Sequence, residues 1–240
     1  MRPAPRPLDD EETGMLTVNL IYGAAGVVSY LAGAIPFGYL LVKLKTGKDI
    51  RTMGSGNIGA TNVARNLGVP WFVPVFVLDF MKGFAPVLWL APWVAARWHC
   101  PICQEPRATL QAFCALCALV GHMWPVWLGF RGGKGVATIG GILFALNWMA
   151  ALGSMAVWVA VFIPFRYVSL GSVIGAIALP LAHYLTAPRV RPAGENPWVI
   201  TVFLGIAGVL VIYRHKANLR RLLAGTEKKF GRKKQEEAPA

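Results

Sequence analysis

Acidic residues are scarce in this chain of 240 residues: 11 Asp and Glu stand against 24 Lys and Arg, and only 15% of the residues are charged. So little charge, together with 55% hydrophobic residues, excludes an ordinary soluble domain and predicts an integral membrane protein. The net charge of +13 could indicate nucleic-acid binding, but the basic residues stand mainly between and after apolar runs. We therefore expect a lipid bilayer as a partner and no nucleic acid.

A nucleotide-binding P-loop and a convincing metal site are also missing. Lys134 is followed by Gly135 rather than Ser or Thr, and no glycine stands at the required distance before Gly133. The four cysteines form two Cys-x-x-Cys pairs, one in a predicted outer loop and one in an apolar run, Cys100/Cys103 and Cys114/Cys117. We expect a strained disulfide in the first pair and small apolar packing residues in the second, rather than zinc or redox chemistry. No metal or cofactor is required.

Long apolar runs predict membrane-spanning helices, since about 20 residues at a rise of about 1.5 Å cross the hydrocarbon core. Gly33 and Pro36 can kink the first of them. The run Val136–Phe165 is too long for one upright crossing and short for two. The other runs are Leu16–Val42, Pro70–Ala96, Ala108–Phe130, Val168–Thr186 and Pro197–Tyr213.

Positive charge resolves this ambiguity, because short loops rich in Lys and Arg stay on the cytoplasmic side. The loop after the first run and the C-terminal tail are both strongly basic, and they share a side only if the long run turns back near Asn147 to Gly153. We therefore predict an all-α polytopic membrane protein of about seven transmembrane helices, N-terminus out and C-terminus in. Its expected parts are a disordered extension (1–14), a transmembrane domain (15–214) and a basic cytoplasmic segment (215–240) whose residues 215–227 complete the active site.

A polar, glycine-rich stretch between the first two apolar runs is the first candidate anion site. Gly54, Gly56 and Gly59 allow left-handed conformations that turn successive N–H groups inward, as in an anion-binding nest. Arg65 adds a planar fork suited to phosphate oxygens. The alternative is a plain turn between two helices, for which such residues are also preferred. Neutral hydrogen-bonding side chains come from Ser55, Asn57, Thr61 and Asn62.

Two further polar clusters fall on the same predicted side. Gly132, Gly133 and Gly135 surround Lys134, so a flexible backbone again presents a point charge to an anion. His215 and Asn218 are three residues apart, so they share a face of a continuing helix. The alternatives are that Lys134 only sets topology and that His215 caps a helix end.

Ionisable residues inside an apolar run are costly enough to indicate pairing or function. Asp79 and Lys82 stand one helical turn apart in the second run. They are interpreted as an ion pair that supports the site, with direct substrate contact as the alternative. Asn147 and His183, lone polar residues in apolar surroundings, are expected to mark bends or helix contacts.

These motifs together resemble the bacterial membrane family of acyl-phosphate:glycerol-3-phosphate acyltransferases. The resemblance covers nearly the whole chain after the extension. It rests on Asp49-Ile50-Arg51 with GSGNIGATNVAR, Asp79 with Lys82-Gly83, GHMWPVWLGFRGGKGVAT, and His215 with Asn218, Arg221-Leu222, Gly225 and Glu227.

The resemblance implies transfer of a fatty acyl group from acyl phosphate to the 1-hydroxyl of sn-glycerol 3-phosphate, without a covalent acyl-enzyme. The product is lysophosphatidic acid, in the first step of phospholipid synthesis. It also implies a bacterial inner-membrane protein with a cytoplasmic site. Independently of the resemblance, we expect a monomer. The catalytic residues it implies are Ser55, Arg65, Lys134, His215 and Asn218. The phosphate- and substrate-binding residues are Gly54, Gly56, Asn57, Gly59, Thr61, Asn62, Gly132, Gly133, Gly135 and Ser169.

The sequence departs from the family pattern at one position, and other functions are also considered. Val168 replaces the first serine of the Ser-Ser-Leu pattern usual in the family, which puts the Ser169 contact in doubt. The His-x4-Asp motif of the soluble type of glycerol-phosphate acyltransferase is missing at all four histidines. A membrane transporter or binding protein for phosphorylated metabolites is the alternative function, and a lipid-scaffolding protein is a third.

Overall fold

The computed structural model describes residues 8–98, 106–190 and 197–231, and within these ranges all regular secondary structure is helical. The predicted all-α membrane class therefore agrees with the described chain. Three 3-10 turns and one π-helical turn, Pro86–Leu90, join some of the helices. The α-helices are α1 (Leu8–Ala34), α2 (Phe37–Thr46), α3 (Ala60–Leu67), α4 (Phe72–Ala85), α5 (Ala91–Arg97), α6 (Pro106–Met123), α7 (Val136–Leu146), α8 (Trp148–Phe165), α9 (Val168–Val190), α10 (Trp198–Arg214) and α11 (Lys216–Leu223).

Five helical segments in the described ranges are long and apolar enough to cross a membrane, and there are six if α10 and α11, bent by 58°, count as one. α7 is apolar but shorter. The predicted total of seven helices and their orientation remain predictions. The five segments are Gly14–Thr46, Val69–Arg97, Arg107–Leu128, Trp148–Phe165 and Val168–Val190.

The start of the chain differs from the expectation. α1 begins at Leu8, so the extension expected to be disordered over residues 1–14 is helical from that point, while residues 1–7 lie outside the described chain. The predicted kink is present: the helix stops at Ala34 and resumes at Phe37, because Pro36 has no N–H to continue the ladder. Cys100 and Cys103 also lie outside the described residues. Cys114 is buried in an apolar cluster, as predicted, and is not in a disulfide.

The long run Val136–Phe165 is broken at Asn147, within the predicted interval. The Asn147 side chain caps α8 by accepting the N–H of Ala150 at 3.0 Å. Its amide nitrogen donates to Thr186 Oγ1 at 2.9 Å and lies 3.3 Å from His183 Nδ1. Asn147 and His183 thus mark a bend and a helix contact, because the break needs buried partners for its polar groups.

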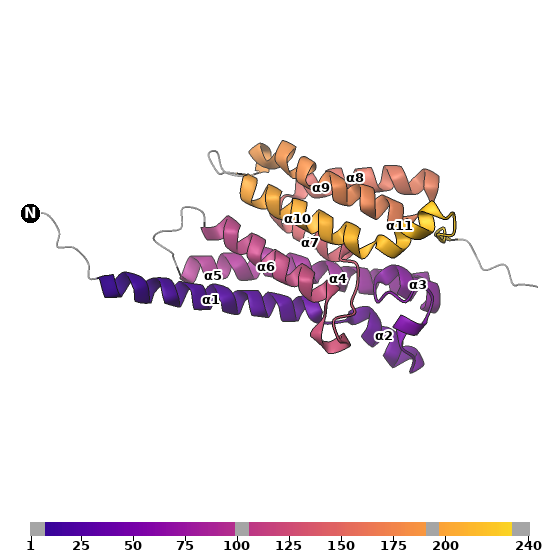
Figure 1. Cartoon of the computed structure of the whole chain (residues 1–240), viewed down its shortest axis with the longest axis horizontal. Coiled ribbons are helices and arrows are strands. Elements are labelled where there is room, and N and C mark those ends of the chain that lie inside the picture. Colours follow the sequence, from indigo (N-terminus) through magenta and orange to yellow (C-terminus); the bar gives the residue numbers. More distant parts are fainter. Residues whose placement is uncertain (1–7, 99–105, 191–196, 232–240) are drawn as a thin grey trace, which may run out of the picture.

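The helices gather the polar motifs at one end of the bundle. α1 packs along α6, α4 along α7, and α8, α9 and α10 lie side by side (Figure 1). α2, α3 and α11 sit together at the end opposite the start of α1 (Figure 1). The three motif segments, far apart in sequence, therefore meet at a common end of the molecule.

Candidate active site

Asn62 organises the first glycine-rich loop. This side chain is 1% exposed and lies in the first turns of α3. Its Oδ1 accepts the N–H of Ser55 at 2.8 Å, and its Nδ2 donates to the carbonyls of Met53 and Asn57 at 3.0 and 2.8 Å. Gly54 and Gly56 have positive φ angles of 59° and 70° that let the chain turn around this amide.

The loop corrects part of the sequence prediction. Gly59 has a φ of −79°, so it is not left-handed. The N–H of Gly56 donates to Met53 O, and that of Gly59 to Asn57 Oδ1. Because these groups and the Ser55 N–H have internal partners, the expected anion-binding nest is not available in this loop. The N-terminus of α3, from Gly59 to Thr61, lines a cavity instead and presents the positive end of a helix dipole.

The second loop is held from two sides. The N–H groups of Gly132 and Gly133 donate to Met123 O and His122 O, at 3.2 and 3.0 Å. The Arg214 guanidinium donates to the carbonyls of Gly132 and Gly133, at 2.7 and 3.0 Å. A Cβ at Gly133 would collide with the imidazole of His122, so the loop approaches that ring as only glycine can. Lys134 follows from this fixed backbone.

Lys134 begins a chain of charged and polar contacts to the third motif. Its Nζ donates to Asn218 Oδ1 at 2.5 Å, and Asn218 Nδ2 donates to Glu227 Oε1 at 2.6 Å. The same carboxylate accepts from Ser169 Oγ at 2.8 Å and from Arg221 Nε at 2.7 Å. The Glu227 carboxylate, which is 6% exposed, thus links Ser169 on α9 and Asn218 on α11, and through Asn218 it is connected to Lys134.

His215 lies between α10 and α11, where the chain bends. Its Nδ1 is 2.8 Å from the carbonyl of Val211, which can only accept, so Nδ1 carries the hydrogen. In the neutral ring this leaves the lone pair on Nε2 as an acceptor. His215 and Asn218 are both buried and both line the same cavity, as their predicted common face requires.

The predicted ion pair is present deep in the bundle. Lys82 Nζ lies 2.7 Å from Asp79 Oδ1, with the two side chains 3% and 4% exposed. Lys82 Nζ also lies 3.4 Å from His122 Nδ1, which must accept because an ammonium has no lone pair. The ion pair therefore positions the imidazole of His122, against which Gly133 packs.

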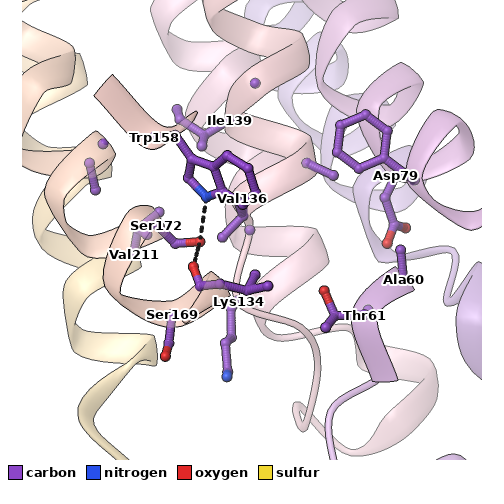
Figure 2. Close-up of a pocket in the computed structure, with 18 of the residues that line it drawn as sticks. Ala60, Thr61, Asp79, Lys134, Val136, Ile139, Trp158, Ser169, Ser172 and Val211 are labelled. Atoms are coloured by element: carbon purple, nitrogen blue, oxygen red, sulfur yellow. Dashed lines mark hydrogen bonds between the residues drawn. The ribbon is translucent and has the colours of Figure 1, made fainter. Parts of the chain in front are cut away.

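Two cavities meet at these motifs. The first, of about 700 Å³, starts at a polar end near Lys134 and continues between apolar walls. Figure 2 shows Lys134 lying between Ser169 and Thr61, with Val136, Ile139 and Trp158 further in. The second, of about 620 Å³, is lined largely by charged and polar side chains. The residues that line both cavities are Ser55, Asn57, Lys134 and Asn218.

The predicted site residues divide by position. Gly59, Thr61, Asn62, Arg65, Gly135, Ser169 and His215 line the first cavity, and Gly56 and Gly132 the second. Gly54 and Gly133 line neither and act on loop shape. In the described part of the chain, the side chains of Ser55, Thr61 and Arg65 have no hydrogen-bonding partner, so they are available to a ligand.

Burial and neighbouring charges set the electrostatics of the polar end. Burial lowers the pKa of Lys134 to about 8, with Glu227 opposing and Arg221 and Arg65 adding to the shift. Burial alone would raise the pKa of Glu227, but hydrogen bonds from Asn218, Arg221 and Ser169 lower it overall. The carboxylate is therefore ionised at neutral pH, and the lysine is charged but close to its titration range.

Three contributors were not identified as site residues from the sequence: Glu227, Arg214 and His122. Glu227 is the only acidic residue between His215 and Lys234, and this isolation was the available signal. Arg214 and His122 act on backbone atoms of another segment, which no local pattern predicts. Their role depends on tertiary contacts alone.

Comparison with known proteins gives a consistent result. A family model described as glycerol-3-phosphate acyltransferase matches residues 24–225. Glycerol-3-phosphate acyltransferases from Brucella anthropi and Aquifex aeolicus are each 42% identical to this chain, over 222 and 205 residues; these cover 92% and 85% of this chain and 98% and 96% of the relatives.

Two solved structures are also similar. Both are of PlsY, an integral membrane glycerol 3-phosphate acyltransferase. The glycerol 3-phosphate form has a TM-score of 0.73 and 40% identity, covering 88% of this chain and 96% of that one. The lysophosphatidic acid form has a TM-score of 0.71 and 38% identity, covering 88% and 95%.

Proposed function

The chain belongs to the glycerol-3-phosphate acyltransferase family, and we propose that it transfers a fatty acyl group from acyl phosphate to the 1-hydroxyl of sn-glycerol 3-phosphate. The products are lysophosphatidic acid and inorganic phosphate, in the first step of phospholipid synthesis. We further propose a monomer in the bacterial inner membrane, with the site facing the cytoplasm. The basic residues of the first loop and of α11, which lie at the site end of the bundle (Figure 1), support this orientation.

The observation that carries the proposal is the meeting of an apolar cavity and a polar cavity at Lys134. An acyl transfer needs a long apolar donor and a small polar acceptor to meet at one point. Each cavity matches one of these substrates in chemistry. A transporter or binding protein for a phosphorylated metabolite would need only the polar cavity, so the long apolar cavity favours the acyltransferase.

The first cavity suits the acyl phosphate. Its polar end offers Lys134, Arg65 and the N-terminus of α3 to the phosphate. Its walls are apolar and come from α4, α7, α8 and α9. Some lining side chains are well exposed, such as Phe144 at 45% and Leu152 at 54%, which is consistent with a chain entering from the bilayer. The apolar lining includes Phe72, Phe76, Ile139, Leu143, Met155, Trp158, Phe162 and Leu179.

The second cavity suits glycerol 3-phosphate, which is small and anionic. Four arginines line it, although three have structural contacts: Arg51 pairs with Asp49 at 2.6 Å, Arg214 binds the second loop, and Arg221 donates to Glu227 at 2.7 Å. Guanidinium groups bind phosphate oxygens through paired N–H donors. The fourth arginine is Arg131.

The chemistry requires no covalent enzyme intermediate. The glycerol oxygen forms a bond to the acyl carbon, the bond from that carbon to the phosphate oxygen breaks, and phosphate leaves. The hydroxyl proton passes to His215 Nε2 or to the departing phosphate. Lys134, at the junction of the cavities, stabilises the negative charge on the oxygens, and the two cavities fix the reacting groups together.

The proposal is tested with purified protein in detergent, given palmitoyl phosphate with and without glycerol 3-phosphate. We expect phosphate release that depends on glycerol 3-phosphate and matches lysophosphatidic acid formation one to one. Palmitoyl-coenzyme A serves as the comparison donor and should give no product. Product from coenzyme A alone would overturn the donor assignment, and no product from either donor would overturn the enzyme.

The activity should also fall at alkaline pH. The folded pKa of Lys134 is lowered to about 8, so the ammonium that attracts phosphate is present below this pH and lost above it. We expect kcat/KM for acyl phosphate to decline above about pH 8, because this parameter reports groups of the free enzyme. Lys134→Arg keeps its charge and should lose this alkaline limb. If kcat/KM declines above about pH 8 to the same extent in wild type and in Lys134→Arg, the decline is not caused by Lys134.

A further inference from the structure

We propose that the paired faces of α8 and α9 form a ruler that sets which acyl chain lengths this enzyme accepts. The inference rests on the proposed acyl-phosphate donor and concerns the apolar part of its cavity. Gly175 keeps the channel open halfway along, and the Asn147–His183 contact closes its far end. The specificity is therefore built into two levels of the same helix pair.

α8 and α9 run antiparallel with their residues at matched depths. Trp158 Nε1 donates to Ser172 Oγ at 3.4 Å (Figure 2), and further along the helices Asn147 Nδ2 lies 3.3 Å from His183 Nδ1. The step from Trp158 to Asn147 and the step from Ser172 to His183 are both eleven residues. Residues at equal distances along α8 and α9 from the Trp158–Ser172 contact therefore face each other.

Cavity-lining residues occupy one face of each helix through these levels. On α9 they recur every three or four residues, which is the spacing of a single helical face. α8 shows the same spacing in the opposite direction. In the register set by the two contacts above, the lining residues pair, from the polar end inward, as Val168 with Phe162, Ser172 with Trp158, Gly175 and Ala176 with Met155 and Ser154, and Leu179 with Ala151.

The channel ends one level beyond Leu179. There Asn147 is 1% exposed and His183 0%, and Asn147 also donates to Thr186 Oγ1 at 2.9 Å. Neither Asn147 nor His183 lines the cavity. An acyl chain that pushed further would have to separate buried hydrogen-bonded groups, which is unfavourable. The break between α7 and α8 thus also forms the floor of the channel.

The depth of the channel translates into carbon atoms. From Ser169 to Leu179 the helix rises about 15 Å, and to His183 about 21 Å, at about 1.5 Å per residue. A carbon chain with bonds of about 1.52 Å and angles near 111° advances about 1.25 Å per bond. The channel therefore holds about 12 carbons before Leu179 and about 16 before the floor.

Gly175 is the position at which the ruler can be shortened without disturbing the helix pair. A Cβ there would lie 3.8 Å from Ser154 O and from the Trp158 Cβ, which is ordinary van der Waals contact. A larger side chain would extend into the cavity that Gly175 lines. This level is about 9 Å from Ser169, or about seven carbons along the chain.

The experiment measures kcat/KM for acyl phosphates of 8, 12, 16 and 18 carbons in wild type and three variants. Gly175→Leu should lower the ratio of the 16-carbon to the 8-carbon value by at least about tenfold, since the longer chain meets the new side chain. Leu179→Ala should shift the profile in the opposite direction, raising the 16-carbon relative to the 12-carbon value. The matched control is Gly153→Leu on α8, where a Cβ meets nothing within 4 Å and no cavity is lined.

The outcomes separate the ruler from the proposed function. Opposite shifts in Gly175→Leu and Leu179→Ala, with wild-type behaviour in Gly153→Leu and an unchanged KM for glycerol 3-phosphate, are the expected result. Unchanged profiles in active variants would overturn the ruler alone, because the chain would then leave the channel sideways into the detergent. If Gly175→Leu fails to fold, an unshifted Leu179→Ala profile still overturns it. A wild type inactive with every acyl phosphate would overturn the proposed function and the ruler with it.

Discussion

Lys134→Ala is expected to lower kcat/KM by about 10²- to 10³-fold, the loss usual when a preorganised group that stabilises developing charge is removed. Lys134 lies where the two cavities meet and donates to Asn218 Oδ1. Its removal leaves the phosphate without a nearby ammonium and loosens Asn218. The measurement is glycerol 3-phosphate-dependent phosphate release, in variants shown to be folded by size-exclusion elution and thermal unfolding.

Two companion variants make this result specific. Lys134→Arg keeps the charge but changes its shape, and we expect a smaller loss. Lys45→Ala removes a cation that contacts the Trp71 ring and lines neither cavity, so it should retain wild-type activity. A folded Lys134→Ala protein with undiminished turnover would remove the lysine from the mechanism.

Asp79→Ala should destabilise the fold by about 3–5 kcal/mol, as expected when one partner of a buried ion pair is removed. It would leave the Lys82 ammonium charged and unpaired, with its side chain 3% exposed. The loss should appear as a clear decrease in the midpoint of thermal unfolding in detergent. Activity should fall as well, since Lys82 holds His122 beneath Gly133.

The double variant Asp79→Ala/Lys82→Met tests the cause. Replacing both partners removes the unpaired charge, so much of the stability should return. Equal destabilisation in the single and double variants would indicate that lost packing, and not the stranded ammonium, is responsible. The comparison uses the same helix positions throughout and needs no assumption about the substrates.

The sequence was sufficient where a feature depended on local chemistry. The kink at Pro36 follows from the missing N–H of proline, and the break at Asn147 was expected because its run could not cross once. The Asp79–Lys82 pair followed from helical spacing. The topology argument from charge placed the three motif loops on one predicted side, and residues of all three line the second cavity.

The sequence was insufficient where backbone groups have more than one available partner. Gly54, Gly56 and Gly59 suggested a nest, but the composition of the loop could not indicate that Asn62 and Asn57 would accept two of its N–H groups. Glu227 shows the same limit. Its contacts with Ser169 and Asn218 depend on how α9 and α11 pack together, which residue spacing within one segment cannot predict.

The four residues shared by the two cavities have a pharmacological consequence. A single molecule carrying an alkyl phosphonate on one side and a glycerol phosphate on the other would occupy both cavities across Lys134. Once the first half is bound, the second would be present at an effective concentration of about millimolar for a short linker that spans the gap. The inhibitor would thus gain avidity from the same geometry that the proposed acyl transfer requires.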